Sequence, residues 1–249
     1  MIGVLGGMGP QAGVDLASKI IANTIARRDQ DHIPTLLFSD SGIPDRTDYL
    51  FGRTQVNPAP MMARAVKSMA AAGARFVGIA CNTAHSPPIF ETFLREVEAE
   101  CPEVKLLHLI EETVSAIQDH FPRVRRVGIL STTGTYKFRL YDDSLISKGL
   151  YPLRPKNIEN LGEAIYNPDL GIKACSTPVT VQAREWVGQA VESVIEQGAE
   201  AVILGCTELT LALPSAHHLG IPLIDPSTFL ARALIRAAAP DRLAPWRVA

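Results

Sequence analysis

AAGARFVGIACNTAHSPP at residues 71–88 and QGAEAVILGCTELTLALP at residues 197–214 show the same order of features, and this repeat decides the fold. Each copy passes through a helix end, a Gly-Ala pair, a charged residue and an apolar strand, then reaches a cysteine, a threonine-containing turn and a proline. A second echo pairs MIGVLGGMGP at residues 1–10 with RVGILSTTGT at residues 126–135, each an apolar strand that enters a turn of small residues. The chain is therefore expected to hold two similar lobes.

Short apolar runs alternate with longer segments of helical spacing along the rest of the chain. The runs are rich in Val, Ile and Leu, as parallel strands buried on both faces are. They cover residues 1–5, 35–39, 76–81, 106–110, 127–131 and 201–206, and the helical segments include residues 12–28, 60–72, 89–100 and 180–197. This alternation predicts an α/β fold in which each lobe is a mainly parallel sheet flanked by helices.

The chain is expected to cross between the lobes twice, at short apolar strands that end in acidic or proline-containing turns. The crossings are placed near residues 106–112 and 214–225. Lobe 1 then comprises residues 1–105 with 214–249 and carries Cys81, and lobe 2 comprises residues 106–213 and carries Cys206. Because α/β proteins bind ligands at the carboxyl ends of their strands, we expect the active site in the cleft between the lobes.

The composition favours chemistry on a small molecule. Of the 249 residues, 47% are hydrophobic and 20% are charged, and a net charge of -2 predicts no basic surface for nucleic acid or an anionic membrane. No apolar run approaches the roughly 20 residues of a membrane span, and the N-terminus enters a strand without a basic leader, so a cytoplasmic protein is expected. The four cysteines form no CxxC pair, so reduced thiols are expected.

Cys81 and Cys206 occupy matching places in the repeat and are the candidate acid/base groups. A thiol acts as a base only as the thiolate, so its pKa must be lowered, as a helix start favours, or its proton passed to a neighbour. Two such groups facing one another suit stereoinversion, since one removes the α-proton while the other delivers a proton to the opposite face. Polar residues that suit a carboxylate follow each cysteine. They are Asn82 and Thr83 in the first copy, and Thr207 and Glu208 in the second.

The remaining motifs have simpler interpretations. Cys101 and Cys175 lack this context and are expected to be inert. The glycine-rich N-terminal turn departs from G-x-G-x-x-G, so its glycines are expected to let the backbone approach the substrate rather than a dinucleotide. His85 is interpreted as a structural hydrogen-bonding group, and His217-His218 lack the spacing of metal ligands. Glu208 either orients the second thiol or the substrate amine, or caps its own helix.

Taken in order, the motifs resemble those of the aspartate/glutamate racemase family, specifically its aspartate racemase branch. The resemblance covers nearly the whole chain. It is carried by IGVLGGMGP at 2–10, IPDRT at 43–47, CNTAH at 81–85, HLIEET at 108–113, GCTEL at 205–209 and IDP at 224–226. It implies a two-lobed amino-acid racemase that uses no PLP, no other cofactor and no metal, and that forms a homodimer.

The resemblance also implies roles for single residues. Cys81 and Cys206 become the catalytic pair, and Arg46 looks like the ligand of the substrate's side-chain carboxylate, which a guanidinium holds bidentately. Lys173 stands about where the family has a second basic residue, although NPDLGIKACSTP at 167–178 departs from the usual pattern. The other implied substrate contacts are Met8, Asn82, Thr83, Thr132, Thr207 and Glu208.

The leading hypothesis is interconversion of L- and D-aspartate, with glutamate as a possible substrate. Glutamate racemases of cell-wall synthesis carry Asp-Ser where Gly7-Met8 stands here, which disfavours that branch. A broad-specificity racemase for neutral amino acids stays open, although Arg46 argues against it and both cysteines are retained where some such members have Thr at the first. A non-catalytic amino-acid-binding protein would not need paired thiols. A thiol redox protein would form a disulfide between Cys81 and Cys206.

Overall fold

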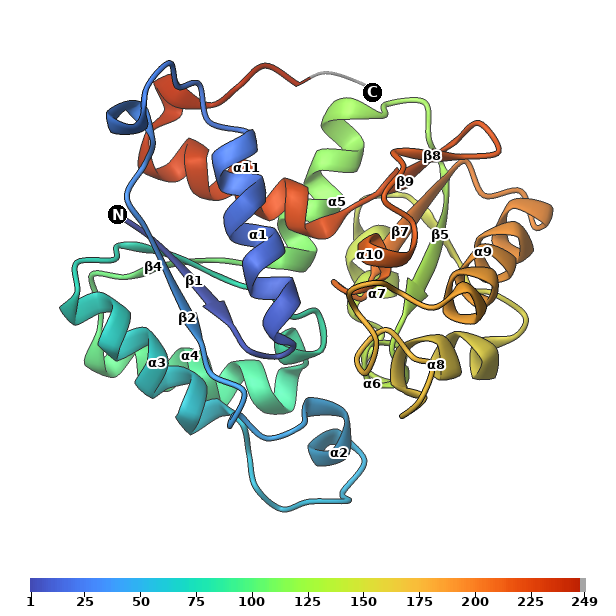
Figure 1. The fold of residues 1–249 in the computed structure, drawn as a ribbon, viewed down its shortest axis with the longest axis horizontal. Helices are drawn as coiled ribbons and strands as arrows, with labels where there is room; N and C mark the ends of the chain where they lie inside the picture. The colour runs from blue at the N-terminus through green and yellow to red at the C-terminus, as the bar shows by residue number, and fades with distance from the viewer. Residues whose placement is uncertain (247–249) are drawn as a thin grey trace. The chain divides into compact units, whose positions relative to one another are not determined.

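The computed structural model describes residues 1–246 and divides the chain into two units, each with its own sheet (Figure 1). Unit 1 comprises Met1–Glu112 and the segment that begins at Ser227, and unit 2 is Thr113–Pro226. The sequence predicts the boundaries at 105/106 and 213/214, whereas the units change at 112/113 and 226/227. The later positions coincide with helices, because α5 (Leu109–His120) runs through the first boundary and α11 (Pro226–Ala238) begins at the second.

Unit 1 is built on a parallel sheet of four strands in the order β2-β1-β3-β4. Its strands are β1 (Ile2–Gly6), β2 (Thr35–Ser39), β3 (Phe76–Ile79) and β4 (Lys105–Leu107). Its helices, besides α11 and the start of α5, are α1 (Pro10–Ala22), α2 (Arg46–Leu50), α3 (Ala59–Ala71) and α4 (Pro87–Glu100), with short 3-10 turns η1 (Asp29–Asp31), η2 (Thr83–His85) and η3 (Pro240–Arg242).

The alternation of side chains along β1 assigns the two faces of this sheet. Ile2 and Val4 belong to a buried cluster with α1 and α11. Gly3 faces the other way, where a Cβ would lie 3.1 Å from the sulfur of Met69 on α3. Helices therefore cover both faces, as the continuous apolar runs predict.

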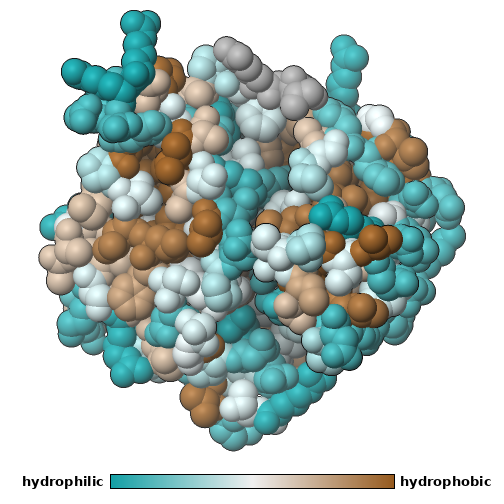
Figure 2. Space-filling view, in the orientation of Figure 1, coloured by the Kyte–Doolittle hydropathy of each residue, from teal (hydrophilic) through white to brown (hydrophobic). Residues whose placement is uncertain are grey.

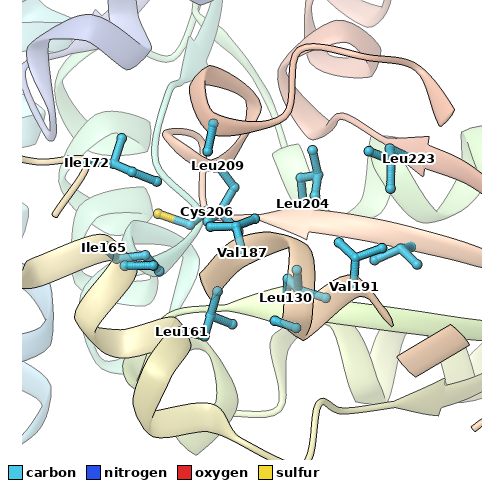
Figure 3. Close-up of a cluster of buried hydrophobic side chains, with 14 of the residues drawn as sticks. Leu130, Leu161, Ile165, Ile172, Val187, Val191, Leu204, Cys206, Leu209 and Leu223 are labelled. Atoms are coloured by element: carbon cyan, nitrogen blue, oxygen red, sulfur yellow. The ribbon is translucent and has the colours of Figure 1, made fainter. Parts of the chain in front are cut away.

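Unit 2 has five strands in the order β6-β5-β7-β9-β8, parallel except for the antiparallel pair β8–β9. They are β5 (Arg126–Ser131), β6 (Tyr151–Leu153), β7 (Ala201–Gly205), β8 (His217–His218) and β9 (Ile221–Ile224). The helices are α6 (Thr133–Lys137), α7 (Leu140–Ser147), α8 (Ile158–Tyr166), α9 (Val181–Glu196) and α10 (Leu209–Ala212). One buried cluster joins β5 and β7 to α8 and α9, and Figure 3 shows Cys206 at its side, with the sulfur toward Ile165 and Ile172.

The predicted α/β fold with helix-flanked parallel sheets is confirmed, and β1 and β3 hold the same places in the first sheet as β5 and β7 in the second. The strand predicted at residues 106–110 is wrong in its second half, because β4 ends at Leu107 and α5 starts at Leu109. The long helix predicted to residue 28 ends at Ala22. None of the described helices combines the length and the hydropathy of a membrane span.

Hydrophobic side chains also reach the surface. Figure 2 shows them as patches between hydrophilic residues on the face that it presents. On α1, Val14 and Ile21 are 48% and 58% exposed. In unit 2, Ile146 on α7 and Tyr151 on β6 are 52% and 65% exposed. Ile146 and Tyr151 both line a surface cavity.

Candidate active site

Both candidate cysteines lie just beyond the carboxyl end of an interior strand. Cys81 comes two residues after the end of β3, and Cys206 directly follows β7. Their exposed fractions are 6% and 5%, and both thiols are free. Each cysteine therefore stands where the repeat places it, at the edge of its sheet where parallel α/β units bind ligands.

The helices that follow the cysteines are too short to act as strong dipoles. The turn η2 has three residues and α10 has four, so few peptide dipoles are aligned behind either thiol. The pKa of Cys206 is raised well above its ordinary value, first by burial and then by the Glu208 carboxylate, while the Lys173 ammonium acts in the other direction. Burial and the carboxylate thus favour the thiol form of Cys206 at neutral pH, against the thiolate that a helix start is expected to favour.

The Glu208 carboxylate accepts hydrogen bonds from the Cys206 thiol and the Lys173 ammonium. The Cys206 Sγ donates to Oε2 of Glu208 at 3.0 Å, and the Lys173 Nζ donates to Oε1 at 2.6 Å. The Thr207 hydroxyl lies 3.3 Å from Oε2. Glu208 stands at the N-cap position of α10 without a side-chain capping bond. Of the roles open to Glu208, the geometry favours orientation of the thiol over capping.

The charges of this cluster follow from its contacts. Burial opposes ionisation of Glu208, but the Lys173 ammonium and the hydrogen bonds from Lys173 and Cys206 outweigh it, so the pKa of this carboxyl lies below its ordinary value. Burial likewise opposes the charge of Lys173, and Glu208, Cys206 and Tyr166 together raise its pKa above the ordinary value. At neutral pH the cluster is an ammonium, a carboxylate and a neutral thiol.

The α8–α9 loop carries Lys173 to this cluster. The loop is tied back to α8 by Ile172 N–H to Ala164 O at 2.8 Å and Lys173 N–H to Ile165 O at 3.2 Å, and the Ile172 side chain is fully buried in the core (Figure 3). A Cβ on Gly171 would lie 2.6 Å from a backbone nitrogen, so only glycine allows this path. Although the sequence of this segment departs from the usual family pattern, the loop still places Lys173 beside Glu208 in the candidate site.

In unit 1, His85 fixes the backbone around Cys81. Its Nδ1 lies 2.9 Å from the carbonyl oxygen of Cys81, and its Nε2 accepts from Leu109 N–H at 3.4 Å. Because Nε2 accepts, Nδ1 carries the proton and donates. Burial and then the neighbouring His108 lower the pKa of His85 well below its ordinary value, which keeps the ring neutral. Both ring nitrogens are therefore engaged in backbone hydrogen bonds, as the structural interpretation of His85 requires.

Arg46 joins two loops of unit 1. Its Nη1 donates to the carbonyl oxygens of Ile43 and Pro44 at 3.3 and 2.9 Å, and its Nη2 donates to that of Met8 at 3.2 Å. Arg46 is the first residue of α2 and directly follows Asp45, which caps that helix. The structure thus brings Arg46 and the Met8 turn together, and part of the guanidinium is used to hold them.

The remaining predicted site residues follow Cys81 in unit 1 or lie at the strand ends around Cys206 in unit 2. Asn82 and Thr83 follow Cys81 and are 3% and 5% exposed. Thr132 is the N-cap of α6 and accepts from Thr135 N–H. It follows β5, whose last residue pairs with Gly205 of β7, so Thr132 and Cys206 stand at the ends of adjacent strands. Unit 1 thus collects Met8, Arg46, Cys81, Asn82 and Thr83, and unit 2 collects Thr132, Lys173, Cys206, Thr207 and Glu208.

Sequence reasoning missed Tyr141, which supports the Cys206 turn. It is fully buried on α7, and a Cβ on Gly205 would lie 2.9 Å from its ring. Burial raises its pKa well above the ordinary value, while a hydrogen bond with Thr113 acts in the other direction. Nothing in the local sequence marks this tyrosine, because its neighbours Gly205 and Thr113 are distant along the chain. Within residues 1–246, no group of three or more His, Cys, Asp or Glu side chains is arranged to hold a metal.

Comparison with known proteins identifies a matching family and similar structures. The model of the Asp/Glu/Hydantoin racemase family matches residues 5–234. The broad specificity amino-acid racemase RacX of Bacillus subtilis is 26% identical over 239 residues, 94% of this chain and 96% of the relative. The structure of the Picrophilus torridus aspartate racemase is 29% identical, with a TM-score of 0.79 over 95% of this chain and 93% of that one. A glutamate racemase of Francisella tularensis in complex with D-glutamate shares the fold, with a TM-score of 0.64 over 99% of this chain and 83% of that one, at 19% identity.

Proposed function

The chain belongs to the Asp/Glu/hydantoin racemase family, and from this premise we propose that it interconverts L- and D-aspartate through Cys81 and Cys206 without a cofactor. It is an amino-acid racemase, an isomerase, because its relatives over nearly the whole chain are amino-acid racemases. One observation carries the proposed mechanism. Each unit holds one buried cysteine at the carboxyl end of an interior strand, followed by polar residues.

The proposed reaction is a two-base proton exchange at the α-carbon. One thiolate takes the α-proton and becomes a thiol, and the other thiol gives its proton to the opposite face and becomes a thiolate. For the other enantiomer the roles of the two cysteines exchange. One conversion exchanges their protonation states, and the reverse conversion restores them. The state of Cys206 supports this scheme, since a neutral thiol held by Glu208 is a proton donor ready for use.

Glu208 and Lys173 act in this scheme as positioning residues. After Cys206 has given up its proton, a thiolate lies beside the Glu208 carboxylate, and the Lys173 ammonium on the other carboxylate oxygen offsets the repulsion. Asn82, Thr83 and Thr207 supply buried polar groups for the α-carboxylate and amine of the substrate. Donors fixed in place before the reaction stabilise charge that develops on that carboxylate.

Arg46 is proposed as the ligand of the aspartate side-chain carboxylate, because a guanidinium can hold a carboxylate bidentately and this one lies beside the Met8 turn. A second candidate function is racemisation of neutral amino acids. The Lys173–Glu208 ion pair favours it, since the pairing neutralises the second basic residue that an acidic substrate would use. The similarity to a broad specificity racemase supports the same alternative.

Chiral chromatography of L-aspartate, L-glutamate and L-alanine incubated with the enzyme tests this assignment. We expect aspartate to give the highest kcat/KM, and Arg46→Leu to lower it by about 100-fold, the loss of a charge-assisted pair. Arg53→Leu is the control, because Arg53 follows the same short helix and forms an exposed ion pair with Asp48. Circular dichroism checks that Arg46→Leu remains folded. Faster turnover of alanine than of aspartate by the wild type would favour the second candidate.

We also propose, from the resemblance alone, that the enzyme works as a cytoplasmic homodimer. Light scattering coupled to size exclusion tests the assembly. A mass of twice the 26.9 kDa chain is expected, and a mass of one chain at micromolar concentration would contradict it.

A further inference from the structure

A cavity of about 710 Å³ lies along α7 and β6 of unit 2. It has the size of a small-molecule site. None of its lining residues belongs to the proposed racemase site, and the proposed function gives it no role. Its walls combine two arginines with exposed hydrophobic side chains.

The cavity is lined by two arginines, each paired with an aspartate. Arg154 donates through Nε and Nη2 to Asp142 at 3.1 and 2.7 Å, and Arg139 donates through Nε to Asp143 at 2.9 Å. Within residues 1–246, neither Nη1 of Arg154 nor the two Nη atoms of Arg139 have a protein hydrogen-bond partner. Both guanidiniums are therefore anchored by aspartates and retain donors for an anion.

Other lining residues are apolar. Leu150 is buried, whereas Ile146 and Tyr151 are 52% and 65% exposed. A hydrophobic ligand body that covers these two side chains would remove apolar surface from water, a favourable change of about 25 cal/mol per Å². The cavity is thus suited to a molecule with an anionic group at one end and a hydrophobic body.

We propose that this cavity is a second ligand site, which binds a small carboxylate with a hydrophobic body. The carboxylate is held by Arg139 and Arg154, and the body lies against Ile146, Leu150 and Tyr151. Asp142 lines the same cavity, but its charge is matched by Arg154. Arg139 is likewise paired with Asp143, so the ligand carboxylate is held by the guanidinium N–H groups that the two aspartates leave unengaged.

A chain of contacts leads from this site to the turn that carries Thr132. The Arg154 Cζ lies 4.9 Å from the ring centroid of Tyr136, and its Nη2 lies 3.4 Å from the Tyr136 carbonyl oxygen. The Tyr136 hydroxyl donates to Ile129 O at 2.6 Å and accepts from Ser131 N–H at 3.0 Å. Ser131 directly precedes Thr132. Tyr136 therefore connects Arg154 to the end of β5, so binding of a carboxylate at Arg154 is expected to change the environment of Ser131.

Two-dimensional amide NMR of the whole enzyme, titrated with 4-phenylbutyrate, tests the proposal. We expect saturable shifts for residues 146–154 and for Ser131, and none with the neutral 4-phenylbutyramide. Arg139→Gln should weaken binding about tenfold, the value of one charge-assisted hydrogen bond. Arg126→Gln is the matched control, since Arg126 and Arg139 have side chains 51% and 52% exposed and each forms one ion pair. Tyr151→Ser should also weaken binding.

Three results would overturn the proposal. The first is equal affinity of wild type and Arg139→Gln, and the second is equal affinity for the carboxylate and its amide. The third is shifts confined to the turns of Cys81 and Cys206, which would place the probe in the racemase site. The readout needs no racemase activity, so the second site and the proposed reaction can fail independently.

Discussion

At the scale of single residues, Glu208 bears directly on the proposed chemistry, because its carboxylate accepts a hydrogen bond from the Cys206 thiol and helps to keep that thiol protonated. Its two carboxylate oxygens are divided between the thiol and the Lys173 ammonium. The thiol is buried, and its pKa is raised first by that burial and next by the carboxylate. Removing the carboxylate charge should therefore favour the thiolate.

We predict that Glu208→Gln shifts the pH midpoint of Cys206 alkylation by iodoacetamide to lower values. A negative neighbour is lost and Lys173 is freed, and both changes stabilise the thiolate. The measurement uses a background in which Cys81, Cys101 and Cys175 are serine, and mass spectrometry follows the reaction. Glu200→Gln, at an exposed ion pair of the same unit, should leave the midpoint unchanged. A midpoint that stays or rises in Glu208→Gln would contradict this electrostatic role.

Lys173→Met should lower the free energy of unfolding by about 3 kcal/mol at pH 7, because it leaves the buried Glu208 carboxylate without its ion-pair partner. The pKa of Glu208 is depressed in the folded protein, so its ionisation contributes stability above the unfolded value and this is lost as pH falls through the folded value. Urea denaturation at several pH values should show the wild-type advantage narrowing below about pH 4.3. Lys156→Met, at an exposed pair with Glu196, is the control. A pH-independent difference would argue against the pairing.

The local sequence could identify the cysteines but not their protonation states. Cys81 and Cys206 stand out because each follows a buried strand within a repeat. The state of Cys206 depends on Lys173, which the α8–α9 loop brings from a distant part of the chain. Arg46 could be identified as a candidate ligand, but its bonds to backbone carbonyls depend on the loop conformation.

At the scale of elements, the packing of the β1–α1 turn against the end of β2 positions Met8. Gly7 has a φ of +90°, and a Cβ there would lie 2.3 Å from the backbone of Asp40. The close approach that this glycine permits in the structure is to Asp40. Its expected approach to a substrate remains a prediction.

Gly7→Ala should therefore destabilise the enzyme by about 3 kcal/mol, since the left-handed conformation is unfavourable for alanine and β2 must also move. Gly52→Ala is the matched control, with a φ of +73° and no atom within 4 Å of the added Cβ. It should lose only about 1 kcal/mol, the conformational part. Urea unfolding of both variants separates the two contributions. Equal losses would show that the contact with Asp40 is unimportant.

The elements that the sequence could not predict share physical features. The strand β6 is short and contains Pro152, and proline is disfavoured inside strands. The strand β9 also contains a proline, Pro222, but it lies within residues 214–225, where the sequence predicts a short apolar strand. Residues 106–110 are apolar except for His108, and an apolar run of this length fits a strand or the start of a buried helix equally well. The chain divides that run, with β4 before His108 and α5 after it.

At the scale of the whole molecule, the two units differ in how the chain builds them. Unit 2 is one continuous segment with its own sheet and buried cluster. Unit 1 needs two segments, because α11 near the end of the chain supplies Leu230, Leu234 and Ile235 to the core beside β1. A Cβ on Gly78 of β3 would lie 2.9 Å from Leu234, so α11 packs closely on that sheet.

Residues 113–226 expressed alone are accordingly predicted to fold, and residues 1–112 alone are not. The first segment contains its whole core, whereas the second leaves the face of β1 and β3 that α11 covers open to water. Thermal unfolding followed by circular dichroism should be cooperative for 113–226 and featureless for 1–112. Adding residues 227–249 to 1–112 through a short Gly/Ser linker should restore cooperativity. A cooperative transition for 1–112 alone would contradict this assignment of the core.

The most direct test of the two-cysteine mechanism is exchange of the α-proton in D2O, followed by NMR on L- and D-aspartate separately, with purified enzyme and no PLP. The wild type is predicted to incorporate deuterium with inversion from either enantiomer. Cys81→Ser and Cys206→Ser are each predicted to lose the exchange or to retain it for one enantiomer only, and the retained enantiomer should differ between the two variants. Undiminished racemisation by either variant would contradict the mechanism.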